Sequence, residues 1–215
     1  MRRRLIRLYA FLVRSKCVLI AVLATLAFPT NAGAKPVLLL LHPGGFLSGS
    51  TATMDSAASY AKPNFQPVEV DYPTDHFPGI LRYSRDVAQS YPGRRVLAYG
   101  ESAGGSIAAR LGELGAVKEA AIQAPIADVP TFIKPYADYY HVDWSKPAAW
   151  LSPDRHPSEE PVRAWIPHND QLSSDTWAWV NRDPLVTGQS IPGKHLQQPY
   201  RTAAMHAAID YLASR

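Results

Sequence analysis

Short continuous apolar runs that alternate with helical patterns constrain this 215-residue chain more than any other feature. The run at 37–41 (VLLLL) contains no polar residue, which is typical of a parallel strand covered on both faces. The other candidate strands are 68–71, 95–99, 120–124 and 162–166, and helical patterns fall at about 51–61, 79–91, 103–115 and 200–214. This alternation predicts an α/β fold, a three-layer sandwich whose mainly parallel sheet has about five or six strands and helices on both faces.

The turn after the third candidate strand predicts a catalytic serine. It reads GESAGG (100–105) and passes directly into a helical pattern. A serine in such a Gly-x-Ser-x-Gly turn is held on a sharp strand-to-helix bend that exposes its hydroxyl, and Gly100 and Gly104 remove side chains that would clash there. We predict Ser102 as the nucleophile, with the N-terminal N–H groups of the next helix facing a developing oxyanion.

A glycine turn follows the first candidate strand, where it reads HPGGF (42–46). The tetrahedral intermediate of acyl transfer needs two or more N–H donors, one of them from the residue after the nucleophile and others from a turn of this kind. We therefore predict an oxyanion hole made by the N–H groups of Gly44, Gly45 and Ala103. Pro43 has no N–H group and cannot contribute.

Three segments together resemble a known family. HPGGF, DYPTDHFPGILRYSRDV (71–87) and GESAGG are similar to the motifs of esterases of the hormone-sensitive-lipase-like group, which have the α/β-hydrolase fold. The resemblance implies a serine esterase that needs no cofactor. It has departures: Pro43 replaces a glycine and Glu101 stands where Asp is commoner. The family's two preceding strands and large N-terminal cap also have no counterpart, so we expect a minimal fold with an exposed site.

The acid and the base are expected after the nucleophile, in the order Ser, Asp, His. Asp170 follows the fifth candidate strand in a setting (HNDQL, 168–172) that resembles the acid loop of the family, while Asp175 and Asp183 are alternatives. His195 lies in the loop before the last helix, as the histidine of the family does. We predict a catalytic triad of Ser102, Asp170 and His195.

The other histidines are assigned no catalytic role. His206 falls within the last helical pattern and His42 belongs to the oxyanion loop. His168 lies in the acid loop HNDQL, and His76, His141 and His156 lie in predicted loops with no companion ligands, so we predict neither a metal site nor a cofactor.

The stretch 126–160 interrupts the alternation within the predicted hydrolase domain (35–215). It is rich in proline and large aromatic residues and is too long for a plain strand-to-helix loop. A small lid over the site is one interpretation, and an irregular surface excursion is the other. Its aromatic residues, with Trp177 and Trp179, either stack on a sugar or aromatic alcohol or belong to the core.

The charge of the chain is unevenly distributed. In total 22 Lys and Arg face 18 Asp and Glu, a net charge of +4 that by itself suggests a nucleic-acid partner. Six of the basic residues lie within 1–34, where there is no acidic residue, so the other 181 residues carry 16 basic and 18 acidic side chains. The predicted domain is therefore slightly acidic, and we expect no nucleic-acid partner.

Residues 1–34 have the pattern of a secretory signal peptide. A basic segment at 1–16 precedes an apolar run at 17–28 and small residues that end at Ala34. The run is shorter than the roughly 20 residues of a membrane-spanning helix, although an uncleaved anchor is the alternative. We predict cleavage after Ala34 and a secreted or periplasmic protein that has no membrane attachment after cleavage. Since Cys17 is the single cysteine, the mature chain would contain none.

The predicted function is hydrolysis of small carboxylic esters, with short acyl groups favoured because the site is expected to be shallow. Amide or peptide hydrolysis by the same triad is the second hypothesis. A non-catalytic binding protein on the same fold is the third.

Overall fold

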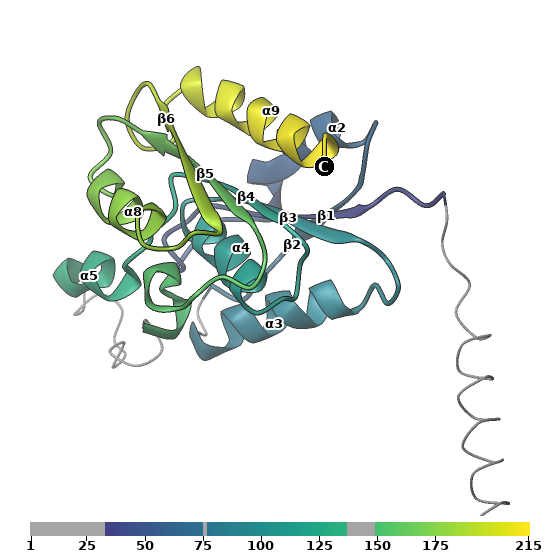
Figure 1. Ribbon diagram of the computed structural model, residues 1–215, viewed down its shortest axis with the longest axis horizontal. Coiled ribbons are helices and arrows are strands. Elements are labelled where there is room, and N and C mark those ends of the chain that lie inside the picture. The colour runs from purple at the N-terminus through teal and green to yellow at the C-terminus, as the bar shows by residue number, and fades with distance from the viewer. Residues whose placement is uncertain (1–32, 75–76, 137–148) are drawn as a thin grey trace, which may run out of the picture. The chain divides into compact units, whose positions relative to one another are not determined.

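A six-stranded parallel sheet organises the molecule (Figure 1). The computed structural model describes residues 33–74, 77–136 and 149–215. The strand order is β2-β1-β3-β4-β5-β6, and every neighbouring pair is parallel. The strands are β1 (Val37–Leu41), β2 (Gln66–Val70), β3 (Val96–Glu101), β4 (Ala120–Gln123), β5 (Val162–Pro167) and β6 (Val186–Ile191). This confirms the predicted α/β fold class.

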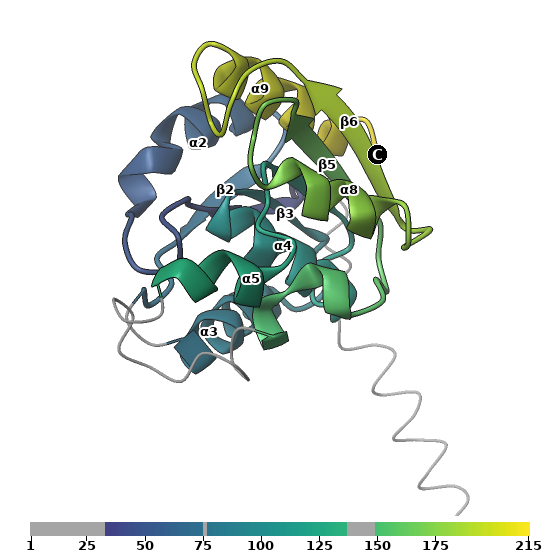
Figure 2. The same ribbon diagram turned by 90° about the vertical axis from the view of Figure 1, so that its left-hand side faces the viewer.

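Helices cover both faces of the sheet, as Figures 1 and 2 show. One face carries α2 (Asp55–Ala61) and α9 (Tyr200–Ala213), and the other carries α3 (Phe77–Gln89), α4 (Ala103–Glu113) and α8 (Ser173–Val180). The alternation of side chains along β1 explains the two layers, because successive residues point to opposite faces. Leu39 and Leu41 pack with residues of α3 and α4, whereas Leu38 and Leu40 pack with residues of α2 and α9.

The continuous apolar runs mark the interior of the sheet. All residues of β1, β3 and β4 are buried, so both faces of these strands are covered. The boundaries of the predicted strands and helices differ from the observed ones by at most two residues. The helical pattern at 51–61 divides into a 3-10 turn, η1 (Thr51–Met54), and α2.

The sequence prediction missed strand β6, helix α8 and the short helices within 126–160. Strand β6 (VTGQSI) lies at the edge of the sheet and exposes most of its central residues, so it has no apolar run to reveal it. Helix α8 follows β5 and packs on that strand and on β6. A Cβ on Gly188 would lie 2.5 Å from the Trp177 ring, which shows how closely α8 approaches the strand. Trp179 is buried in the core, and Trp177 is half-buried and packs against that core.

The described ends of the stretch 126–160 are anchored to the domain. They contain α5 (Val129–Ile133), η2 (Lys134–Tyr136) and η3 (Pro153–Arg155). Ile126, Val129, Ile133 and Leu151 are buried in the core beside α4. Residues 137–148 lie outside the described residues, and the lid stays a prediction.

The predicted signal peptide also lies outside the described residues, apart from Gly33 and Ala34. Lys35–Arg215 forms one compact unit. Among the helices that the structure describes, none is long and apolar enough to span a bilayer.

Candidate active site

Ser102 stands on a strained bend between β3 and α4. Its backbone has φ 53° and ψ −119°, a left-handed conformation that residues with a side chain rarely adopt. The Ser102 N–H group donates to the Gln123 carbonyl at the end of β4, at 2.9 Å, which holds the bend against the neighbouring strand. A Cβ on Gly100 would lie 2.2 Å from the Gly104 carbonyl oxygen, so the bend can close only with glycine there. This is the local geometry that the GESAGG motif predicts.

His195 joins Ser102 to Asp170. The Nε2 atom of His195 lies 2.9 Å from the Ser102 hydroxyl oxygen, and its Nδ1 atom lies 2.7 Å from Oδ2 of Asp170. The Asp170 side chain is buried, and its other oxygen accepts a hydrogen bond from the Leu172 N–H group at 3.0 Å. A carboxylate held in this way fixes the orientation and tautomer of the imidazole, which leaves Nε2 free to accept the serine proton.

The two alternative acids have other partners. Asp175 lies in the first turn of α8, where it accepts a hydrogen bond from the Ser174 hydroxyl. Asp183 accepts from the N–H groups of Ser158 and Leu185 at 2.8 and 3.0 Å. The structure therefore brings Asp170, and neither of these, to His195.

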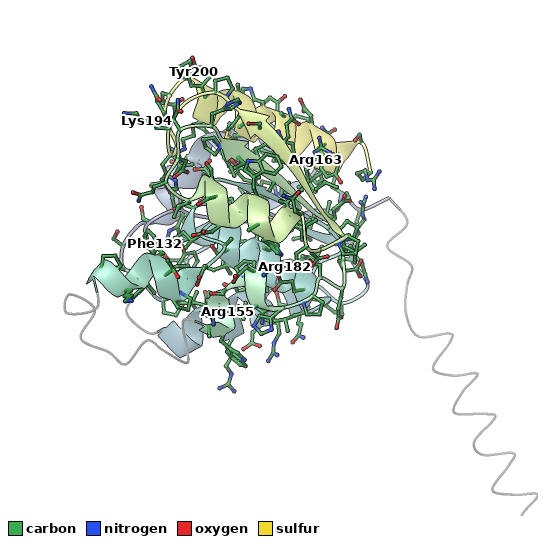
Figure 3. The ribbon with its side chains drawn as sticks, turned by 60° about the vertical axis from the view of Figure 1, so that its left-hand side comes forward. Phe132, Arg155, Arg163, Arg182, Lys194 and Tyr200 are labelled. Atoms are coloured by element: carbon green, nitrogen blue, oxygen red, sulfur yellow. The ribbon has the colours of Figure 1, made fainter. Side chains whose placement is uncertain are left out.

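Backbone hydrogen bonds hold the acid loop beside the histidine loop. The His168 N–H group donates to the Ile191 carbonyl at 2.9 Å, and the Asn169 N–H group donates to the Gly193 carbonyl at 3.1 Å. The two loops leave β5 and β6, which are neighbours in the sheet. Figure 3 shows Lys194 on the histidine loop and Tyr200 where that loop enters α9.

The turn predicted to form the oxyanion hole has three consecutive residues with positive φ. These are Gly44, Gly45 and Phe46, at 144°, 62° and 70°. A Cβ on Gly44 would lie 1.9 Å from the Ser48 carbonyl oxygen, so only glycine fits this turn. Ala103 follows Ser102 and is the first residue of α4. The first N–H groups of a helix have no partner within the helix, so the N–H group of Ala103 is suited to bind an oxyanion.

Tyr72 holds His42, the first residue of the glycine turn 42–46, and the sequence alone did not single it out. Its ring stacks on the His42 ring, with centroids 4.1 Å apart, and its hydroxyl donates to the His42 carbonyl at 2.6 Å. Burial raises the pKa of Tyr72 well above its usual range, so the hydroxyl keeps its proton. The only signal was the position of Tyr72, two residues after the end of β2, in the DYP segment of the family resemblance.

His206 and His156 have structural surroundings. His206 stacks on Tyr60 of α2, with ring centroids 3.9 Å apart. His156 lies near Arg110, and burial together with that guanidinium lowers its pKa. His76 and His141 lie outside the described residues. Within the part of the chain that the structure describes, no group of three or more His, Cys, Asp or Glu is arranged to hold a metal ion.

Solved structures of esterases have the same fold. An esterase from Pseudomonas putida matches with a TM-score of 0.70 at 22% identity, over 86% of this chain and 76% of that one. An esterase from the archaeon Pyrobaculum calidifontis matches with a TM-score of 0.67 at 20% identity, over 85% and 78% of the two chains. Carboxyl esterase 2 from the fungus Tuber melanosporum gives 0.68 at 15% identity, over 84% and 78%.

The sequence itself matches no protein-family model and no curated protein. At these identities the structural likeness establishes the fold, and the fold is that of the α/β-hydrolases, as the HPGGF and GESAGG motifs suggested.

Proposed function

We propose that this protein is a serine hydrolase that cleaves carboxylic esters. The observation that carries the proposal is the position of His195, within hydrogen-bond distance of both the Ser102 hydroxyl and the buried Asp170 carboxylate. Acyl transfer requires a nucleophile, a base and a group that orients the base, joined to one another by hydrogen bonds. The esterase names of the structural neighbours favour an ester over an amide substrate.

The reaction would proceed through an acyl-enzyme. His195 takes the proton of Ser102 as the serine oxygen attacks the ester carbonyl carbon. The tetrahedral intermediate then collapses, the bond to the alcohol oxygen breaks, and His195 gives the proton to the departing alcohol. Water repeats the sequence on the acylated serine and releases the acid. Asp170 stabilises the imidazolium in both halves of the reaction, and no cofactor takes part.

The developing oxyanion would be bound by the N–H groups of Gly44, Gly45 and Ala103. The support for this assignment is the close approach of the two segments, because a Cβ on Gly104 would lie 2.5 Å from the His42 carbonyl oxygen. Each donor in such a hole contributes on the order of 3 kcal/mol to lowering the barrier.

The substrates would be esters with short acyl groups. The His195 side chain is 36% exposed, which supports a shallow, accessible site among the described residues. An exposed site offers little apolar surface to a long chain, so binding energy stops growing after the first few carbons.

The test is turnover of p-nitrophenyl esters together with labelling by a fluorophosphonate, for the wild type and for Ser102→Ala. We expect acetate or butyrate to be hydrolysed fastest and both turnover and labelling to be lost in Ser102→Ala. A wild type with neither turnover nor labelling would refute the proposed hydrolase activity. A rate maximum beyond about ten acyl carbons would refute the short-chain preference. Faster cleavage of peptide substrates than of esters would favour the amidase hypothesis.

We also propose that the protein is exported and that the segment 1–34 is removed. The support is the order of a basic segment, an apolar run and small residues in the sequence. N-terminal sequencing of the secreted or periplasmic product should begin at Lys35. A product that keeps residue 1 and sediments with membranes would show an uncleaved anchor instead.

A further inference from the structure

A buried carboxylate stands next to the nucleophile. Glu101 directly precedes Ser102, and its side chain is only 1% exposed. An isolated buried charge is strongly unfavourable, so such a group needs a partner or a proton. The Tyr99 hydroxyl, which burial keeps protonated by raising its pKa, donates to Oε1 of Glu101 at 2.8 Å.

Arg201 supplies the opposite charge. Its Nη2 and Nε atoms lie 2.6 and 2.8 Å from Oε2 of Glu101, and its side chain is 25% exposed. Arg201 is in the first turn of α9, directly after the histidine loop, and its backbone N–H group donates to the Gln197 carbonyl of that loop at 2.9 Å. The ion pair therefore ties the nucleophile bend to the element that follows His195.

The same guanidinium contacts a third segment. Its Nη2 atom donates to the Thr53 carbonyl of η1 at 3.3 Å. Helix η1 follows the glycine turn (42–46) that is predicted to bind the oxyanion, with four residues (47–50) between them. One side chain thus connects the segments that carry the nucleophile, the base and the oxyanion donors, although Glu101 and Arg201 are 100 residues apart in sequence.

The pair also has an electrostatic consequence. An unpaired carboxylate beside Ser102 would repel the oxyanion that forms during attack, and burial would weaken the screening of that repulsion. The Arg201 guanidinium bound to Oε2 sets a positive charge against this carboxylate, which opposes the repulsion. Removing the arginine leaves the repulsion in place, whereas removing the carboxylate as well takes the repulsion away.

We propose that Arg201 and Glu101 are positioning residues for the ester hydrolysis inferred above: Arg201 aligns the three catalytic segments and cancels the charge that Glu101 places beside the oxyanion. The inference depends on the proposed function. It assigns neither residue a contact with the substrate.

The test compares kcat and KM in four variants, with kcat expressed per active site titrated by a fluorophosphonate. In Arg201→Met we expect kcat to fall about 10- to 100-fold with KM changed less than about threefold, because the loss falls on the transition state. Arg201→Lys should recover part of kcat, since it keeps the charge and loses the paired geometry. Glu101→Gln should cost less than Arg201→Met, and the double variant Glu101→Gln/Arg201→Met should be faster than Arg201→Met alone.

Arg163→Met is the matched control. Arg163 lies near the start of β5, at the opposite end of the strand from the acid loop (Figure 3). Its guanidinium packs over the rings of Trp165 and Tyr211. Its kcat should equal that of the wild type. Equal kcat in Arg201→Met and Arg163→Met would overturn the inference and leave the esterase proposal standing. A double variant no faster than Arg201→Met would overturn the charge argument. A wild type that neither labels nor turns over would overturn the esterase proposal and this inference together.

Discussion

Gly104 lies against the carbonyl group of Leu41, so closely that a Cβ at position 104 would be 2.1 Å from the carbonyl oxygen. This places the first turn of α4 directly on the end of β1, where the glycine turn begins. The contact joins the bend at Ser102 to the glycine turn 42–46 through backbone atoms alone. A side chain at position 104 would therefore clash with backbone, and no side-chain rearrangement could relieve that clash.

Gly104→Ala should therefore be severely destabilised, by several kcal/mol or to the point of not folding, because backbone has to shift. The control is Gly93→Ala. Gly93 has φ 71°, but none of the described atoms lies within 4 Å of its Cβ position. Only the backbone strain remains there, about 1 kcal/mol. Urea unfolding of both variants measures the difference, and similar stabilities would contradict the geometry of the bend.

Asp170→Asn should lower kcat about 10⁴-fold, because an amide cannot hold the imidazole in the tautomer that accepts the serine proton. Asp175→Asn makes the same chemical change at the other acid of this region, which hydrogen-bonds to Ser174 instead. It should keep the wild-type rate. Steady-state kinetics with p-nitrophenyl acetate separates the two, and a reversed order would mean that Asp175 is the acid.

Tyr72→Phe should cost about 1–3 kcal/mol of stability, because it leaves the buried His42 carbonyl without its donor. It should also lower kcat, since the turn predicted to bind the oxyanion starts at that residue. Tyr60→Phe removes an exposed hydroxyl that donates to Asp210, and we expect a change within about 0.5 kcal/mol. Denaturant unfolding and kinetics on both variants check this. Loss of stability without loss of kcat would limit Tyr72 to a structural role.

Stability should fall as pH rises toward 8 because of Glu113. Burial raises the pKa of this carboxyl to about 8, although its ion-pair partner Arg110 opposes the shift. The folded protein then holds the proton more tightly than the unfolded chain, so the contribution is complete below the unfolded pKa and is lost as pH rises through about 8.

The measurement is the free energy of unfolding between about pH 6.5 and 8.5, above the range in which His156, with its lowered pKa, takes up a proton. The wild type should lose on the order of 1–2 kcal/mol across this range, and Glu113→Gln should lose much less. A flat wild-type profile would mean that Glu113 stays ionised beside Arg110.

Much of the fold was readable from local sequence. The apolar runs of β1, β3, β4 and β5 are buried strands, and a central strand of a parallel sheet has to be apolar on both faces. Strand β6 was missed because an edge strand exposes part of its surface and can be polar. Helix α8 was missed because it is short and its pattern is weak beside a loop rich in polar residues.

The sequence by itself determined the bend at Ser102, because the strain at Ser102 and the close approach of Gly100 to the Gly104 carbonyl oxygen are properties of five consecutive residues. It also limited the acid to three candidates and the base to the histidine before the last helix. Only the tertiary structure decided that Asp170 reaches His195, that Tyr72 holds His42, and that Arg201 neutralises Glu101. Each of these pairs joins segments that are distant in sequence, and their contact depends on which strands are neighbours in the sheet and on how α9 packs across it.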